Sequence, residues 1–142
     1  MKFGTHEIPE DHIIFKTKYS FVFTNIRPFL PNHLLVSPIA EKMRISELTK
    51  EENEDIFETV RNITTVLSKI YEGFTINVQD GVSAGQKVLH VHVHVVPRKN
   101  KDLKYNDDIY KEGALDYERV ERSYEEMKQE TLYLRSLFKK YI

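Results

Sequence analysis

The chain has 142 residues, of which 40% are hydrophobic and 30% are charged, as is usual for one soluble globular domain. Its 21 basic and 22 acidic side chains give a net charge of −1, which excludes bulk electrostatic attraction to nucleic acid or to a membrane surface. The absence of cysteine excludes disulfides and suits a reducing compartment. Because the N-terminus has no apolar signal core and no apolar run approaches membrane-spanning length, we expect a cytoplasmic protein.

The first elements expected are short β-strands. Ile13–Lys16 and Tyr19–Thr24 are rich in β-branched and aromatic residues and are separated by a turn. Phe21 and Phe23 share one face of the second strand, where core packing is the simplest interpretation. Asn25 follows directly, and an asparagine at this point is also typical of a turn.

The next strand is expected over Asn32–Pro38, after a loop marked by Pro28 and Pro31. His33 lies at its start. A lone histidine in such a place is commonly a half-buried polar residue, so on the residues alone it carries no assignment.

Two amphipathic helices are expected. Residues 46–71 contain the capping box Thr49-x-x-Glu52. Apolar residues repeat at steps of four and three along this helix: Ile56, Val60, Ile63, Leu67 and Ile70. A second capping box, Ser123-x-x-Glu126, predicts a C-terminal helix over about 124–140.

Between the helices, Phe74–Gln79 alternates cleanly and is expected to pair with the strand that follows. The connection over 80–87 contains two glycines, which allow positive φ and a close backbone approach to a ligand. It lacks the Gly-Lys-Ser/Thr ending of a nucleotide P-loop. Residues 99–122 are rich in charge and are expected to form a flexible, solvated loop.

Strands that are grouped rather than strictly alternating with helices predict an α+β fold, with an antiparallel β-sheet of about five strands and two helices. We expect residues 1–142 to form a single domain.

The most informative stretch is Val88–Arg98, which contains three of the six histidines of the chain. Valines alternate with histidines, which predicts a strand with the valines toward the core and His90, His92 and His94 on the opposite face.

Three imidazoles in a row admit several kinds of site. The backbones of His90 and His94 should lie roughly 13 Å apart, so all three rings cannot reach one zinc ion without a sharp bend. A plain structural strand would need a hydrogen-bond partner for each buried ring. An elongated anion such as a polyphosphate fits the row better, and a histidine can itself be the nucleophile in phosphoryl transfer.

The segment His90–Val96 matches the His-x-His-x-His-x-x signature of the histidine triad (HIT) family of nucleotide hydrolases and transferases, in which x is apolar. Three flanking segments resemble the fragile histidine triad branch: Gln79-Asp80-Gly81, Ala84-Gly85-Gln86 and Pro97-Arg98-Lys99. That branch hydrolyses dinucleoside polyphosphates. The resemblance covers nearly the whole chain and is weakest over residues 111–122.

The resemblance implies a bis(5'-adenosyl)-triphosphatase that cleaves diadenosine triphosphate to AMP and ADP. In this scheme His92 attacks the α-phosphorus, and one of its ring nitrogens is oriented by a backbone carbonyl near His90. His94 stabilises phosphate oxygens, while His90 and His33 order the site.

The resemblance also implies contacts to the substrate. Asn25 would hold the ribose and Gln79 and Gln86 the phosphates, whereas Tyr110, with Lys101 and Lys104, would reach the far end of the substrate. Residues expected to line the base pocket are Phe3, Phe23 and Leu35. For Phe3, a simple core role remains equally open.

The family further implies a homodimer whose two sheets join side by side. No protein-bound metal or cofactor is expected, although Mg²⁺ or Mn²⁺ could accompany the phosphates. Three alternatives stay open: a nucleoside phosphoramidate hydrolase of the same family, a nucleotide-occupied signalling protein with slow turnover, and a metal-dependent binding module.

Overall fold

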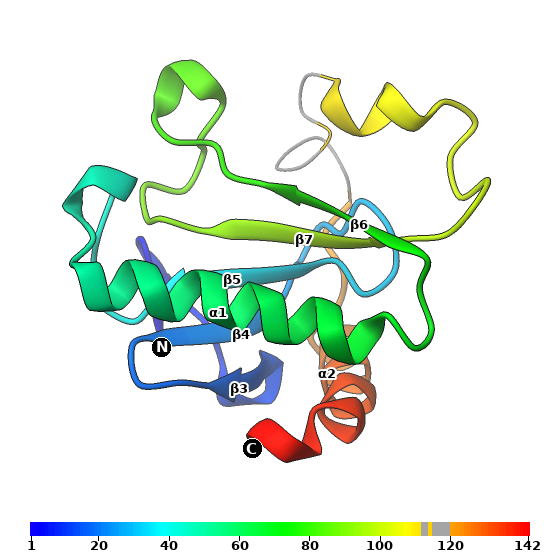
Figure 1. The fold of residues 1–142 in the computed structure, drawn as a ribbon, viewed down its shortest axis with the longest axis horizontal. Helices are drawn as coiled ribbons and strands as arrows, with labels where there is room; N and C mark the ends of the chain where they lie inside the picture. The colour runs from blue at the N-terminus through cyan, green and yellow to red at the C-terminus, as the bar shows by residue number, and fades with distance from the viewer. Residues whose placement is uncertain (112–113, 115–119) are drawn as a thin grey trace.

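The computed structural model describes residues 1–111, 114 and 120–142. Its centre is a five-stranded antiparallel sheet with the order β3-β4-β5-β7-β6 (Figure 1). In chain order, these strands span Ile13–Lys16 (β3), Ser20–Thr24 (β4), Leu34–Pro38 (β5), Gly73–Asn77 (β6) and Val93–Arg98 (β7). Lys2–Phe3 (β1) and His6–Glu7 (β2) form a separate hairpin. The predicted α+β class and the five-stranded sheet are confirmed.

Two α-helices span Lys50–Leu67 (α1) and Tyr124–Leu137 (α2). The capping box of α1 is present, with Glu52 N donating to the Thr49 hydroxyl at 3.1 Å and Thr49 N to the Glu52 carboxylate at 2.8 Å. The prediction that the apolar stripe of α1 extends to Ile70 was wrong, because the helix ends at Leu67 and Ile70 is 43% exposed. In the described part of the chain, no helix is long and apolar enough to cross a membrane.

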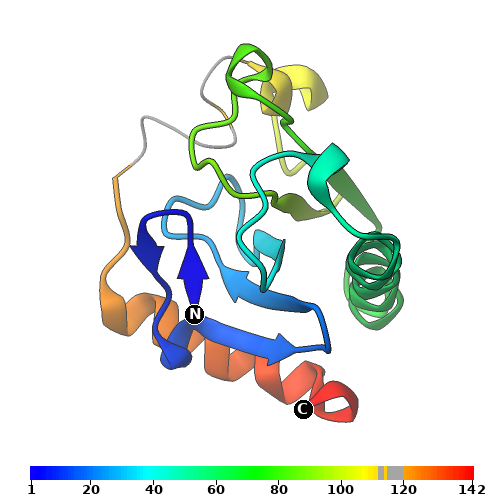
Figure 2. The ribbon, with the colours of Figure 1, turned by 90° about the vertical axis from the view of Figure 1, so that its left-hand side faces the viewer.

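The elements form layers around the sheet. Figure 2 shows α1 over one face and the β1–β2 hairpin over the other, while α2 runs beneath the β3 end of the sheet. Each face of the central strands is therefore covered, which explains why β4, β5 and most of β7 are buried along their whole length.

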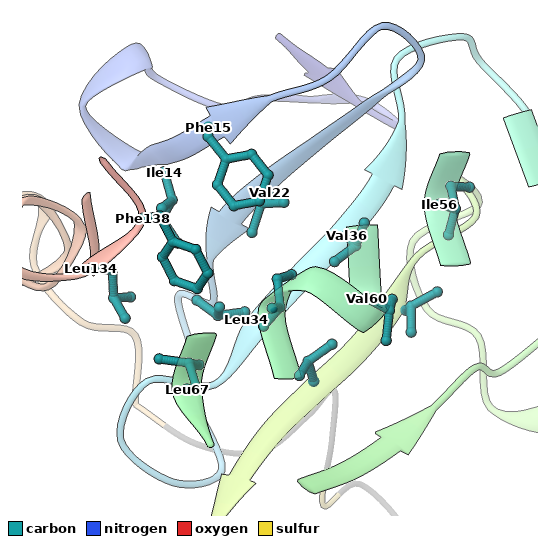
Figure 3. Close-up of a cluster of buried hydrophobic side chains, with 13 residues drawn as sticks. Ile14, Phe15, Val22, Leu34, Val36, Ile56, Val60, Leu67, Leu134 and Phe138 are labelled. Atoms are coloured by element: carbon teal, nitrogen blue, oxygen red, sulfur yellow. The ribbon is translucent and has the colours of Figure 1, made fainter. Parts of the chain in front are cut away.

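The main core lies on the α1 face of the sheet (Figure 3). Alternate residues of β5 and β7 point into it together with one side of α1 and two residues at the end of α2. The buried members that Figure 3 labels are Ile14, Phe15, Val22, Leu34, Val36, Ile56, Val60, Leu67, Leu134 and Phe138.

The opposite face carries a second apolar cluster, formed by Phe3, Ile13, Phe21, Phe23 and Leu35. Val93 and Val95 of β7 face the main core, as the alternation predicts. His92 and His94 therefore lie on the same side of the sheet as the second cluster, and Leu35 is the direct cross-strand neighbour of His94.

Candidate active site

The histidine row begins before the regular strand does. The prediction of a continuous strand from Val88 was wrong, because β7 starts only at Val93. His90 N donates to Val88 O and Val91 N donates to Lys42 O, so the backbone of 88–92 bonds outside the sheet ladder. This departure from the ladder lets consecutive imidazoles turn toward different partners.

His92 is oriented by the backbone. Its Nδ1 lies 2.7 Å from the carbonyl oxygen of His90, and because a carbonyl only accepts, Nδ1 carries the hydrogen. In the neutral ring, Nε2 then holds the lone pair, which is the state that a nucleophile requires. The ring is buried and packs edge-on against Phe3, with centroids 5.0 Å apart.

His90 has both ring nitrogens engaged. Gly4 N donates to Nδ1 at 3.1 Å, and Nε2 lies 2.8 Å from the carbonyl oxygen of Pro38. Burial lowers the pKa of His90 below its ordinary value, which favours the neutral ring. His90 therefore ties the β1–β2 hairpin to β5 and presents its own carbonyl to His92.

His94 and His33 form a two-ring chain. Phe29 N donates to His33 Nδ1 at 2.9 Å, so in the neutral ring the hydrogen of His33 is on Nε2. That nitrogen lies 2.9 Å from His94 Nδ1, which must accept. The hydrogen of His94 is then on Nε2, so His94 is set as a hydrogen-bond donor.

A cavity of about 390 Å³ opens beside His92. Its apolar wall includes Phe3, Phe23 and Leu35, the three residues predicted for the base pocket. Phe3 also belongs to the second apolar cluster, which confirms its core role; its role in the base pocket stays a prediction. The structure thus brings the predicted nucleophile and the predicted base pocket to one hollow.

Asn25 borders the same cavity and is 7% exposed. Its Oδ1 accepts from Arg27 N at 2.9 Å, which is the turn predicted for an asparagine here. Its amide nitrogen lies 3.4 Å from His33 Nε2, beside the His33–His94 chain. The turn therefore holds Asn25 at the cavity wall.

The connection over residues 80–87, here called the glycine loop, is preceded by Gln79 and contains Gln86, and the two glutamines have different surroundings. Gln79 Oε1 is buried and has no hydrogen-bond partner among the described residues. Gly85 has φ +94°, and a Cβ there would lie 2.7 Å from Gln79 Nε2. A glycine is therefore required for the close approach of the loop to Gln79.

Gln86 does not fit the predicted phosphate contact. Its Oε1 accepts from Gly81 N at 2.7 Å, and its Nε2 donates to the carbonyl oxygens of Met43 and Val88, each at 3.1 Å. Gln86 is 3% exposed, and both its Oε1 and its Nε2 form hydrogen bonds within the protein. Its side chain therefore stabilises the conformation of the loop.

Tyr110 lies apart from His92. It is 60% exposed, ends a short 3-10 helix (Asn106–Tyr110) and borders a separate polar hollow beside β6, together with Lys101. The structure does not bring Tyr110 to the cavity that holds the base-pocket residues. Residues 112–113 and 115–119 of the predicted flexible loop lie outside the described residues.

Arg122 and His12 are among the cavity residues that sequence reasoning missed. Arg122 donates to the carbonyl oxygen of Asn25 at 2.6 Å and pairs with Glu130 of α2 at 2.9 Å. This contact joins residues 97 positions apart, so no local sequence pattern predicts it.

Within the described ranges, no three histidine or acidic side chains are grouped so that they could hold a metal ion.

Comparisons with known proteins identify the family. The model of the HIT domain matches residues 5–101, which is more than half of the chain. The chain belongs to the HIT family. A bis(5'-adenosyl)-triphosphatase of Dictyostelium discoideum is 44% identical over 138 residues, covering 96% of this chain and 91% of that protein.

Two further relatives agree with this assignment. A bifunctional bis(5'-adenosyl)-triphosphatase/adenylylsulfatase of Arabidopsis thaliana is 38% identical over 149 residues, covering 96% of this chain and 83% of its own. The crystal structure of a Plasmodium falciparum diadenosine triphosphate hydrolase in complex with cyclomarin A superposes with a TM-score of 0.81 at 31% identity, covering 98% and 84% of the two chains. The predicted HIT family and its fragile histidine triad branch are confirmed.

Proposed function

We propose that this HIT protein is a dinucleoside polyphosphate hydrolase that cleaves diadenosine triphosphate to AMP and ADP through a nucleotidyl-His92 intermediate. The observation that carries the proposal is the 2.7 Å contact between His92 Nδ1 and His90 O, beside a cavity with apolar walls. The names of the similar proteins supply the class of substrate.

The reaction proceeds in two displacements. His92 Nε2 attacks the α-phosphorus in line, so a P–N bond forms, the bond from the α-phosphorus to the bridging oxygen breaks, and ADP leaves. Water then attacks the same phosphorus, the P–N bond breaks, and AMP is released with an oxygen from water. His92 recovers its lone pair and loses its extra charge when the nucleotide departs.

His94 and His33 assist without changing covalently. His33 donates to His94 Nδ1, which leaves the hydrogen of His94 on Nε2 to meet a phosphate or leaving oxygen. A preorganised donor of this kind is worth about 10²–10³ in kcat. We assign Gln79 to a phosphate oxygen, to which its Nε2 would donate; its buried Oε1 accepts no hydrogen bond from the described residues, so that end of the amide is not engaged within the protein. Asn25 is assigned to the ribose.

No protein-bound metal is proposed, and Mg²⁺ or Mn²⁺ would enter with the substrate phosphates. We also propose a homodimer. The support for it is β6, which forms one edge of the sheet and exposes Ile76 to 45%. Sedimentation of the purified protein tests the dimer: a single monomeric species at micromolar concentration would contradict it.

The function is tested by incubating wild-type and His92→Asn proteins with diadenosine triphosphate, diadenosine tetraphosphate and an adenosine phosphoramidate, each with and without EDTA. We expect AMP and ADP from the triphosphate, formed faster than products from the other two and lost in the variant. EDTA should lower the rate only through the cation that accompanies the substrate, so added Mg²⁺ should restore it.

Two outcomes would contradict the proposal. Preferred cleavage of the phosphoramidate would make the protein a nucleoside phosphoramidate hydrolase. Tight binding of the nucleotides without turnover would make it a nucleotide-occupied signalling protein.

A further inference from the structure

His12 is a buried histidine that the proposed mechanism does not use. It lies at the end of a 3-10 helix (Glu10–His12) directly before β3, is 5% exposed, and borders the cavity that contains His92. Its position is close to the base pocket, because the next residue, Ile13, is the cross-strand neighbour of Phe23. A buried polar ring beside aromatic walls calls for a partner.

One nitrogen of His12 has a partner within the protein. Nε2 lies 3.1 Å from the carbonyl oxygen of Tyr124, and because that oxygen only accepts, Nε2 carries the hydrogen. Nδ1 is then an acceptor in the neutral ring. In the described part of the chain, Nδ1 has no hydrogen-bond partner.

The ring of His12 is also held in place. It packs on the ring of Tyr124 with centroids 4.4 Å apart, and the Tyr124 hydroxyl donates to Asp11 at 2.7 Å. This hydrogen bond raises the pKa of Tyr124 and lowers that of Asp11, so the phenol stays protonated and the carboxylate charged. The ring that carries the acceptor Nδ1 is therefore held in place at the cavity wall.

The three apolar residues of the predicted base pocket cannot form hydrogen bonds with the edge of a base. Phe3, Phe23 and Leu35 carry no hydrogen-bonding group in their side chains, so a hydrogen bond from them cannot distinguish one purine from another. Of the other two histidines that line the cavity, His92 is the proposed nucleophile and His6 is exposed in the β1–β2 hairpin. His12 is thus a buried acceptor at this cavity through which the protein could discriminate between purines.

We propose that His12 determines the preference for the nucleobase: its Nδ1 accepts a hydrogen bond from the 6-amino group of adenine and disfavours purines with a 6-oxo group. This proposal rests on the proposed binding of a nucleotide in the same cavity. Hypoxanthine and guanine place an acceptor, O6, where adenine places a donor. When O6 faces Nδ1, neither acceptor receives a hydrogen bond, and this lowers the affinity for a 6-oxo purine.

The test compares adenine with hypoxanthine, since these bases differ at position 6 while their sugars and phosphates are the same. Dissociation constants for AMP and IMP are measured by titration calorimetry at pH 8, and kcat/KM is measured for the diadenosine and diinosine triphosphates. For the wild type we expect a preference for adenine of about tenfold to hundredfold in both. Because binding is measured without turnover, a failure of catalysis and a failure of base selection give different results.

The variant His12→Leu removes the acceptor at similar volume and should reduce both ratios to within about threefold. His6→Leu is the matched control, since it removes the exposed histidine of the same cavity and should keep the wild-type ratios. If His12→Leu does not fold, His12→Phe keeps an aromatic ring against Tyr124 and tests the same loss. Equal binding of AMP and IMP by the wild type, or an unchanged ratio in the folded His12 variant, would overturn the proposal.

Discussion

The histidine cluster and the segment over residues 99–111 both carry predicted functional residues, but their surroundings differ. In the cluster, backbone groups of Phe29, Pro38 and His90 each form a hydrogen bond with a histidine ring nitrogen. In the segment, Tyr110 is 60% exposed and borders a different hollow from the one beside His92.

The difference shows what a fold contributes to a site. Backbone groups decide which nitrogen of His33, His90 and His92 holds the hydrogen, and the ring of His33 decides it for His94. An exposed tyrosine keeps its rotational freedom, and ordering it on a ligand would cost conformational entropy. We therefore expect catalysis to depend strongly on the cluster and weakly on the exposed tyrosines of residues 99–111.

The largest loss among the following changes is expected when the two-ring chain is broken. His94→Leu removes the proposed donor and should lower kcat by about 10²–10³, as measured by AMP formation from diadenosine triphosphate. His33→Leu, which removes the group that orients His94, should lower kcat by a smaller factor.

The double variant separates a chain from two independent residues. Because His33 acts through His94, the double variant should be no slower than His94→Leu alone. Independent losses that multiply in the double variant would contradict the hydrogen-bonded chain as the route by which His33 acts.

The glycine loop gives the next largest effect. Gly85→Ala places a Cβ 2.7 Å from Gln79 Nε2 at φ +94° and should cost about 1–3 kcal/mol of stability. It should also lower kcat/KM by about tenfold, because Gln79 must move. Gly73→Ala is the control, since a Cβ there meets nothing within 4 Å. Thermal melts and kinetics that do not distinguish the two variants would contradict this assignment.

The burial of His90 predicts a dependence of stability on pH. Burial lowers the pKa of His90 in the folded protein below the ordinary 6.5, so as the pH falls the unfolded chain takes up the proton first. Stability should therefore decrease below about pH 6.5. We expect the difference in Tm between pH 7.5 and pH 5.5 to be smaller in His90→Gln than in the wild type. Equal differences would show that His90 does not contribute.

The smallest effect is expected in the exposed segment. Tyr110→Phe should change kcat/KM for diadenosine triphosphate by less than about threefold, as should Tyr105→Phe, a tyrosine 61% exposed in the same segment. A tenfold loss confined to Tyr110→Phe would mean that this segment closes on the substrate, and the contrast between the two regions would no longer hold.

Local patterns in the chain predict much of this structure. The period of two correctly places Val93 and Val95 on the core face, and the Thr49–Glu52 box correctly marks the start of α1. Both depend on neighbours within a few residues. The family resemblance adds the apolar residues of the base pocket, which meet at the cavity.

Other features depend on contacts between distant residues. Gln86 was expected at the phosphates, but its amide is bonded to Met43 and its own loop. Arg122 reaches Asn25, and His12 meets Tyr124, across more than ninety residues in each case. The sequence shows which hydrogen bonds a polar side chain can form, whereas the fold determines which partner lies next to it.

The most direct test of the account is to trap the covalent intermediate on His92. Wild-type protein is mixed with diadenosine triphosphate, quenched within milliseconds under alkaline denaturing conditions that preserve a P–N bond, and examined by intact-mass and peptide-mass spectrometry. We predict one adenylyl group per chain, located on the peptide that contains His92 and missing in His92→Asn. Full turnover with no adduct, or an adduct on another residue, would contradict His92 as the nucleophile.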